Sequence, residues 1–375
     1  MTKASIAAVT TALPENYYQQ EILAAALRRY CMAKQLDFEL DDINSFFTNV
    51  RISGRYFTLP VDSIFDTPKW SETSRKIIEL GLDLATQVVN QLLEKVQLAP
   101  DKISLLNLVT LAMVAPSIDA QLMNRIPFRR HLKRVPIIGW GCLGGTAGVA
   151  RVADYLAGHP QEAAILITLD FSSACWQGSF QSDLVELSKQ AKNSPAAYGD
   201  LISTLVSAAL FGDGAGAVLM VGREHALAQK GLPQVIDSRA NLVPNTQDLM
   251  GMKLIDSGVR NILRPEVADY ASSSLKEVIE PLLAEHNLSL DKIGRWIVHP
   301  GGPKVIQAVE ETFQLDSSAL NLSRKILDQV GNVSSSTVIF MLEDLLLQEP
   351  PRSGTYGLLV GMGPGFSQEA VLLQW

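Results

Sequence analysis

Almost continuously apolar segments recur along the whole chain, and segments with a helical period lie between them. The clearest are ISLLNLVTLA (103–112), VPIIGW (135–140) and AAILITLDF (163–171). Runs of this length and composition are typical of strands that helices cover on both faces of a sheet. We therefore predict a buried strand at each of them, within a layered α/β fold.

The stretch 71–96 has the apolar period of an amphipathic helix, with Ser71 as its predicted N-cap. The predicted buried face of this helix carries Ile77, Leu80, Leu84, Val88 and Leu92. Since the face lies opposite a row of charged residues, we expect it to pack on the predicted sheet.

The second half of the chain repeats the alternation of strands and helices. Strands are predicted at 296–300 and 356–365, and a helix is predicted over 336–348. Because no low-complexity segment or linker separates the halves, we divide the chain only by this pattern, into halves of residues 1–225 and 226–375.

The composition favours a folded protein that acts on small molecules. Hydrophobic residues make up 47% of the 375 residues, which is enough for a large core. The net charge of −7 lacks the positive field that nucleic acid binding requires. No stretch predicts a membrane span or a signal peptide. Three scattered cysteines form neither a disulfide framework nor a metal-ligand spacing, so we expect a reducing cytoplasm and no bound metal.

Cys142 lies in IIGWGCLGGTAG, where an apolar strand passes into a glycine-rich helix start. The positive end of a helix dipole stabilises a thiolate at this place, and glycines let a thioester approach the sulfur. The alternative without a catalytic role is a small cysteine that packs the strand–helix junction. The nucleophile elbow of a cysteine hydrolase fits poorly, because it requires glycine where Trp140 stands.

His299 and Asn332 follow in the second half, in WIVHPGGPKVI and LDQVGNVSSSTVI. His299 ends an apolar strand, which is where ligands bind in open α/β sheets, although a buried core histidine is the alternative. Asn332 precedes a predicted helix, where an asparagine is also an ordinary cap. Together with Cys142, these residues supply a nucleophile, a base and an amide donor. Such a set can take an acyl group from a thioester and stabilise an enolate oxygen.

Five short motifs, in this order, resemble those of the type III polyketide synthases, the chalcone-synthase-like family of the thiolase fold. They are GCLGG, LFGDGAGA, HPGGP, GNVSSS and GMGPG, and they extend over nearly the whole chain. The resemblance implies a thiolase-like fold of two pseudo-repeated α/β halves in an α/β/α/β/α arrangement. It also implies an acyl-CoA starter, malonyl-CoA as extender, no cofactor beyond these coenzyme A thioesters, and a homodimer.

The matching motifs also imply roles for single residues. Cys142 corresponds to the nucleophile that carries the acyl chain, and His299 and Asn332 correspond to the pair that promotes decarboxylation. The residues implied to line the substrate cavity are Ser172, Cys175, Phe211, Asn261, Ser334, Gly363 and Pro364. The residues implied to bind coenzyme A are Arg51, Arg55, Gly301, Gly302 and Lys304. The implied product is an alkylresorcinol, a pyrone or a phloroglucinol-type ring.

The segment between Cys175 and Phe211 is longer than in plant-type members, which favours a bacterial type. It predicts a short amphipathic helix followed by a loop from Pro195, and we expect the segment to form a lid or wall of the cavity. Two rival functions stay open. One is a ketoacyl-synthase-III-like enzyme that performs one condensation with an acyl carrier protein, and the other is a cysteine acyl hydrolase. The intact Cys, His and Asn set argues against a non-catalytic partner subunit.

Overall fold

The computed structural model describes residues 3–36, 40–65, 70–173, 184–228, 231–255 and 258–375. The strands are β1 (Ala4–Ala12), β2 (Asn16–Gln19), β3 (Gly54–Phe57), β4 (Ile103–Thr110), β5 (Lys133–Ile138), β6 (Ala163–Phe171), β7 (Asp213–Gly222), β8 (Gln234–Leu242), β9 (Met250–Ile255), β10 (Gly258–Leu263), β11 (Ile293–Val298), β12 (Tyr356–Gly363) and β13 (Ser367–Gln374). The helices are α1 (Gln20–Ala33), α2 (Leu40–Asn49), α3 (Val61–Phe65), α4 (Trp70–Val96), α5 (Ile118–Leu122), α6 (Gly144–Gly158), α8 (Leu184–Gln190), α9 (Pro195–Leu210), α10 (Val267–Glu285), α11 (Pro303–Phe313), α12 (Asn321–Val330) and α13 (Thr337–Gln348).

One mixed sheet of 9 strands, in the order β11-β12-β13-β8-β1-β7-β6-β4-β5, organises the molecule. The strands β4, β5 and β6 are parallel, whereas β7 is antiparallel to both β6 and β1. Strands from before residue 225 fill one end of the order, and strands from after it fill the other. The two ends meet where β1 pairs with β8, at Ala4–Val235 and Ser5–Gln234. The division of the chain into two halves near this point stays a prediction.

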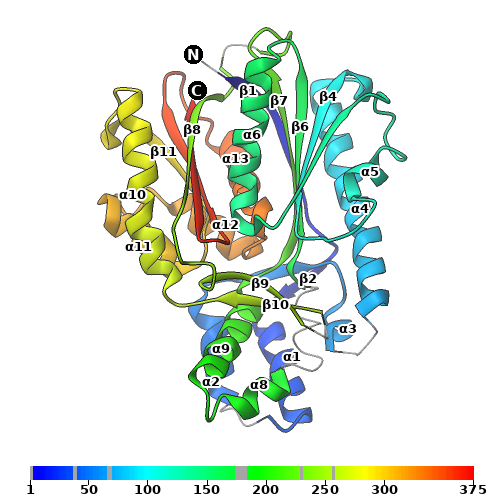
Figure 1. Cartoon of the computed structure of the whole chain (residues 1–375), viewed down its shortest axis with the longest axis vertical. Coiled ribbons are helices and arrows are strands. Elements are labelled where there is room, and N and C mark those ends of the chain that lie inside the picture. The colour runs from blue at the N-terminus through cyan, green and yellow to red at the C-terminus, as the bar shows by residue number, and fades with distance from the viewer. Residues whose placement is uncertain (1–2, 37–39, 66–69, 174–183, 229–230, 256–257) are drawn as a thin grey trace.

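Helices cover the sheet in layers. Figure 1 shows α6 and α13 between the two parts of the sheet, α4 and α5 outside one part, and α10 and α11 outside the other. The middle helix α6 is buried over most of its length and packs among strands of both parts. The predicted layered α/β arrangement is therefore present. None of the helices within the described ranges is long and apolar enough to cross a membrane.

Glycines let the first turn of α6 approach its neighbours closely. A Cβ added at Gly144 would lie 2.3 Å from Val109 Cγ1, and one added at Gly145 would lie 2.2 Å from the backbone oxygen of Ser335. We expected these glycines to make room for a substrate, and that reason is wrong for both, because each faces the protein interior. They bring α6 against β4 and against the short turn Ser334–Ser336 that precedes α13.

Strand β5 is present but exposed, so the prediction of a buried strand at 135–140 is wrong. Val135 is 41% exposed and Ile138 is 46% exposed. The strand lies at the end of the sheet order with β4 as its one neighbour, so its outer edge has no strand beside it within the described chain. Edge position rather than polarity therefore explains the exposure.

Helix α4 begins at Trp70, so Ser71 lies inside it rather than at its cap. Four residues of the predicted buried face are buried, namely Ile77, Leu84, Val88 and Leu92. Leu80 is 38% exposed and was wrongly included. Its neighbour Gly81 faces the sheet instead, where the missing Cβ leaves room for the Phe171 ring.

The segment before Phe211 is more helical than predicted. The helix expected near residue 184 is α8, but Pro195 starts α9 rather than a loop. Proline is favoured at the first position of a helix, since that N–H would be unpaired anyway. The Ser194 side chain caps the helix by accepting a hydrogen bond from the Ala197 N–H at 3.3 Å.

We predict that Gly145→Ala destabilises the protein by about 1–3 kcal/mol, because the added methyl group must displace α6 from the Ser335 backbone. Urea unfolding followed by circular dichroism measures the change. The matched control is Gly158→Ala, at the exposed end of the same helix, where an added Cβ meets nothing within 4 Å. Equal stability of the two variants would contradict the close-packing argument.

Candidate active site

Cys142 lies in a single 3-10 turn, Gly141–Leu143, directly before α6. Gly141 has a φ of +48°, a left-handed conformation that glycine adopts without strain. The Cys142 side chain is almost fully buried. The predicted position of this thiol at a helix N-terminus is thus what the structure shows.

His299 and Asn332 reach the same place from the other part of the sheet. His299 directly follows β11, and its backbone N–H donates to the Val360 oxygen of β12 at 2.9 Å. Asn332 follows α12, and its backbone is held between neighbours, donating to the Leu210 oxygen at 3.0 Å and accepting from the Gly212 N–H at 3.0 Å. Both side chains are buried.

The three side chains form one chain of contacts. The Cys142 Sγ lies 3.8 Å from Asn332 Oδ1 and 3.8 Å from Ser334 Oγ. Asn332 Oδ1 accepts a hydrogen bond from the Ser334 N–H at 2.9 Å, which turns Nδ2 toward His299 Nε2 at 3.4 Å. The amide orientation is therefore fixed by the backbone, and the donor end of Asn332 faces the imidazole.

Burial disfavours the charged forms of both titratable groups. It raises the pKa of the Cys142 thiol to about 12, an effect that hydrogen bonds with Ser334 and Asn332 partly oppose. It lowers the pKa of the His299 imidazole to about 3. The site without substrate therefore favours a neutral thiol and a neutral imidazole, rather than the thiolate that the position of Cys142 at a helix N-terminus predicts.

Asp170 supports the site from behind and was missed in the sequence. It is buried near the end of β6, where its Oδ2 accepts from the Ser335 N–H at 3.0 Å and from Ser335 Oγ at 2.6 Å. Its Oδ1 accepts from the Leu111 N–H at 2.8 Å. Burial raises the pKa of this carboxyl group. The signal was the one acidic residue within the apolar run AAILITLDF, which we had interpreted only as a strand.

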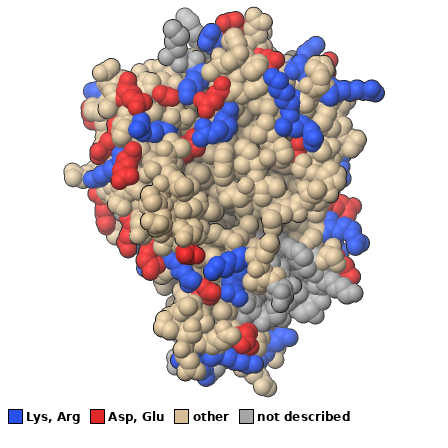
Figure 2. All heavy atoms as spheres, viewed as in Figure 1, with Lys and Arg blue, Asp and Glu red and all other residues tan. Residues whose placement is uncertain are grey.

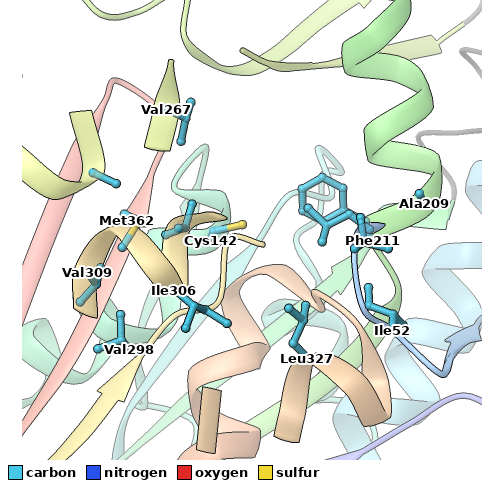
Figure 3. Close-up of a cluster of buried hydrophobic side chains, with 14 of the residues drawn as sticks. Ile52, Cys142, Ala209, Phe211, Val267, Val298, Ile306, Val309, Leu327 and Met362 are labelled. Atoms are coloured by element: carbon cyan, nitrogen blue, oxygen red, sulfur yellow. The ribbon is translucent and has the colours of Figure 1, made fainter. Parts of the chain in front are cut away.

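A cavity of about 520 Å³ opens beside Cys142. Its lining includes five of the residues predicted to contact substrate, which are Ser172, Phe211, Asn261, Ser334 and Pro364. Figure 3 shows the Cys142 sulfur pointing to the side where Phe211 lies. Gly363 is buried next to the lining, with the Trp140 oxygen 2.6 Å from where its Cβ would be. Cys175 lies outside the described residues.

The hairpin of β9 and β10 supplies much of the cavity lining. Asn261 is the one residue of this hairpin that the sequence predicted to line the cavity. The lining residues of the hairpin are Met250, Gly251, Met252, Lys253, Leu254, Val259, Asn261, Ile262 and Leu263. This hairpin forms a separate 2-stranded sheet. Its residues come from a stretch without a recognisable motif, so neither period nor spacing indicated their place.

The residues predicted to bind coenzyme A fall into two groups. Arg51 and Lys304 are exposed, and Lys304 lies in the first turn of α11, after Gly301 and the N-cap Gly302. Arg55, by contrast, is fully buried. Its Nη1 donates to the Phe211 oxygen at 2.7 Å and its Nε donates to Gln20 Oε1 at 3.0 Å.

The assignment of Arg55 to coenzyme A is therefore wrong. A guanidinium that is enclosed by the protein and holds the backbone of Phe211 cannot reach a phosphate at the surface. The interior position of Arg55 depends on the contact between β3 and the turn at Phe211, which a single sequence motif does not reveal.

Comparisons with known proteins agree along the whole chain. Residues 1–224 match the family described as "Chalcone and stilbene synthases, N-terminal domain", and residues 234–375 match the corresponding C-terminal domain. A 1,3,6,8-tetrahydroxynaphthalene synthase of Streptomyces peucetius subsp. caesius is 36% identical over 372 residues, which is 99% of this chain and 93% of that protein. A 3,5-dihydroxyphenylacetyl-CoA synthase of Streptomyces toyocaensis is 29% identical, over 96% of this chain and 87% of that protein.

The comparison with solved structures points to the same family of proteins as the sequence comparison. The crystal structure of the 1,3,6,8-tetrahydroxynaphthalene synthase of Streptomyces coelicolor A3(2), a bacterial type III polyketide synthase, superposes with a TM-score of 0.87. The match has 22% identity and covers 99% of each chain. This likeness confirms the predicted thiolase-like fold. With both family domains matched in order and a full-length relative above 30% identity, the chain belongs to the chalcone and stilbene synthase family, the type III polyketide synthases.

Proposed function

We propose that the enzyme loads an acyl-CoA starter on Cys142, extends it several times with malonyl-CoA, and cyclises the product. The observation that carries this proposal is the fixed amide of Asn332, whose Nδ2 faces His299 Nε2 beside the buried thiol. When Nε2 carries its proton, two donors face each other, and an oxygen placed between them accepts from both. That is the arrangement of an oxyanion hole.

The imidazole can serve two steps in turn. Its Nδ1 makes no hydrogen bond to the described residues, so no such bond there fixes the tautomer. With Nε2 unprotonated, His299 takes the thiol proton as the Cys142 sulfur attacks the starter thioester, and returns it to the departing coenzyme A thiol. With Nε2 protonated, His299 and Asn332 stabilise the enolate oxygen that malonyl-CoA forms on losing carbon dioxide. The enolate carbon then attacks the acyl group on Cys142 and releases the sulfur.

The relatives favour several extensions over one. Their names describe a tetrahydroxynaphthalene and a dihydroxyphenylacetyl-CoA, both hydroxylated aromatic compounds. We extend to this chain a product of the same kind, a poly-β-keto chain closed into a hydroxylated ring, for which resorcinol, pyrone and phloroglucinol types remain candidates. The cavity of about 520 Å³ gives such a chain room to fold. Neither the single-condensation enzyme nor the hydrolase is favoured by these relatives.

For coenzyme A, we propose Lys304 and Arg51 as partners of the phosphates. The N-terminus of α11 adds its dipole at Lys304, and the Gly301–Gly302 backbone, which carries no side chains, leaves room for the pantetheine to approach His299. No cofactor other than these thioesters enters the proposal. Because the chemistry needs a reduced thiol, and Cys31 and Cys142 are both free, we place the enzyme in the cytoplasm.

We also propose a homodimer joined along β5. Its outer edge offers unpaired backbone groups beside the exposed Val135 and Ile138. Ile138 and the exposed Met113 also line the cavity, so a second copy at this edge would cover the cavity from water. Figure 2 shows few charged side chains in the middle of the face that carries α6. A self-complementary edge of this kind suits a two-fold dimer.

Cys142→Ala tests the catalytic proposal. The variant should form no acyl-enzyme and no polyketide, because the nucleophile is absent. It should still release carbon dioxide from malonyl-CoA, since His299 and Asn332 stay in place, and adding Asn332→Ala should lower that release by about 10²–10³. Mass spectrometry of the intact protein and radiolabelled carbon dioxide release measure the two effects. Full product from Cys142→Ala would exclude this mechanism.

The neutral pair predicts how alkylation of Cys142 depends on pH. Since the thiol pKa is raised to about 12, the thiolate fraction should rise about tenfold per pH unit between pH 7 and 9.5, without a plateau. The rate of iodoacetamide addition at Cys142, read by peptide mass spectrometry, measures this. In His299→Ala, the rate of iodoacetamide addition at each pH should stay within about twofold of the native rate. A plateau below pH 7 that His299→Ala removes would instead show an ion pair.

Val135→Asp should weaken the dimer, because it places a carboxylate on the apolar part of the edge, which Val135, Pro136 and Ile138 form. Size-exclusion chromatography with light scattering should give twice the chain mass for the native protein and a concentration-dependent shift to the monomer for the variant. Leu347→Asp changes an exposed leucine of α13 and serves as the control. If both variants kept the native mass, β5 would not be the interface.

A further inference from the structure

The cavity wall formed by β9 and β10 is not part of the main sheet, so its position depends on other contacts. Val259 and Asn261 on β10 line the cavity. Arg260, between them, is not among the lining residues, and its guanidinium pairs with Asp200 of α9 instead. Because Arg260 belongs to β10, a displacement of Arg260 also displaces the residues of this strand that line the cavity.

Asp200 of α9 holds this hairpin with two arginines. Its Oδ2 lies 2.9 Å from Arg260 Nη1, and its Oδ1 lies 2.5 Å from Arg264 Nη2. The carboxylate is 17% exposed, and both guanidinium groups are also largely covered. Figure 2 shows basic and acidic side chains gathered at the level of the β9–β10 hairpin.

The same helix ends at the catalytic site. Asp200 and Phe211 are separated by about three turns of α9, roughly 16 Å. The Phe211 oxygen is held by the buried Arg55, and the Gly212 N–H donates to the Asn332 oxygen at 3.0 Å. Helix α9 is thus fixed to the catalytic loop at one end and to the hairpin by Asp200 near the other.

The cluster of one acid and two bases makes the hairpin sensitive to Asp200. Removing the carboxylate charge weakens the two ion pairs by which Arg260 and Arg264 hold the hairpin to α9, at a largely covered site where such pairs are screened weakly. Other contacts, such as the hydrogen bond from Ser203 Oγ to the Leu263 oxygen at 2.9 Å, keep the hairpin attached. The wall would shift rather than detach.

We propose that Asp200, through Arg260 and Arg264, is a positioning residue that sets the distance between the β9–β10 wall and Phe211, and thereby the number of malonyl units that the product contains. This proposal rests on the polyketide-building function proposed above. It assigns a cavity-defining role to the segment before Phe211, through α9. The decarboxylating groups His299 and Asn332 lie on other elements and do not touch the clamp formed by Asp200, Arg260 and Arg264.

The test compares Asp200→Asn, which has the same shape without the charge, with Asp200→Glu, which keeps the charge. For Asp200→Asn, we expect the ratio of the main product to shorter or longer by-products to fall about five- to tenfold. Release of carbon dioxide from malonyl-CoA should change less than about twofold. Hydrogen exchange of residues 250–263 should accelerate, because the hairpin is less firmly docked. Asp200→Glu should have a product ratio and a rate of hydrogen exchange in residues 250–263 that are close to those of the native enzyme.

Asp83→Asn is the matched control, since Asp83 pairs with Arg125 on an exposed part of the surface. It should leave product ratio and exchange unchanged. An Asp200→Asn enzyme with the native product ratio and native exchange would overturn the proposal. A proportional loss of decarboxylation and product would also overturn it, because that result means general damage. Hydrogen exchange reports on the clamp without any product, so a failure of the polyketide function itself would be recognised separately.

Discussion

The contact between the first turn of α6 and the turn Ser334–Ser336 is the constraint on which the site depends. It joins the element that carries the nucleophile to the segment that carries the amide, and it exists only because Gly145 has no side chain. Asp170 fixes the other side of the same turn through Ser335. Once this turn is held, its Ser334 N–H sets the Asn332 amide, and the amide sets the donor that faces His299. The packing of α6 on this turn therefore determines the hydrogen bond to Asn332, and that hydrogen bond determines which end of the amide faces His299.

Burial has a cost and a use in this arrangement. A thiol and an imidazole that are removed from water both favour their neutral forms, so the empty site does not maintain a reactive thiolate. In the proposed mechanism, charge develops only when a thioester enters and its carbonyl oxygen can accept from the donors of His299 and Asn332. A neutral thiol reacts more slowly with oxidants and alkylating agents than a thiolate does. Reactivity is then tied to the presence of substrate.

The sequence predicted what local patterns determine. Apolar runs located the strands, and the motifs around Cys142, His299 and Asn332 gave three residues that the structure brings together. The predictions from the sequence were wrong where the burial of a residue depends on a neighbour that lies far away in the chain. Arg55 appeared to be a surface cation because nothing local shows that β3 is enclosed, and β5 appeared buried because polarity does not distinguish an edge strand from a central one. Pro195 was taken as a breaker, although proline also starts helices.

The structure separates two tasks that one cavity performs. The groups that we propose to activate thioesters belong to the core, where close packing of α6, β11 and the Ser334–Ser336 turn allows little change. The wall that we propose to limit the product belongs to a hairpin outside the main sheet, which is held to α9 by the Asp200 ion pairs and the Ser203–Leu263 hydrogen bond, with Val259 and Ile262 buried. Substitutions in the hairpin can alter the space for the growing chain at small cost to the fold. Because the hairpin lies outside the main sheet that carries the catalytic residues, the proposal predicts that product length can vary while the condensation chemistry is kept.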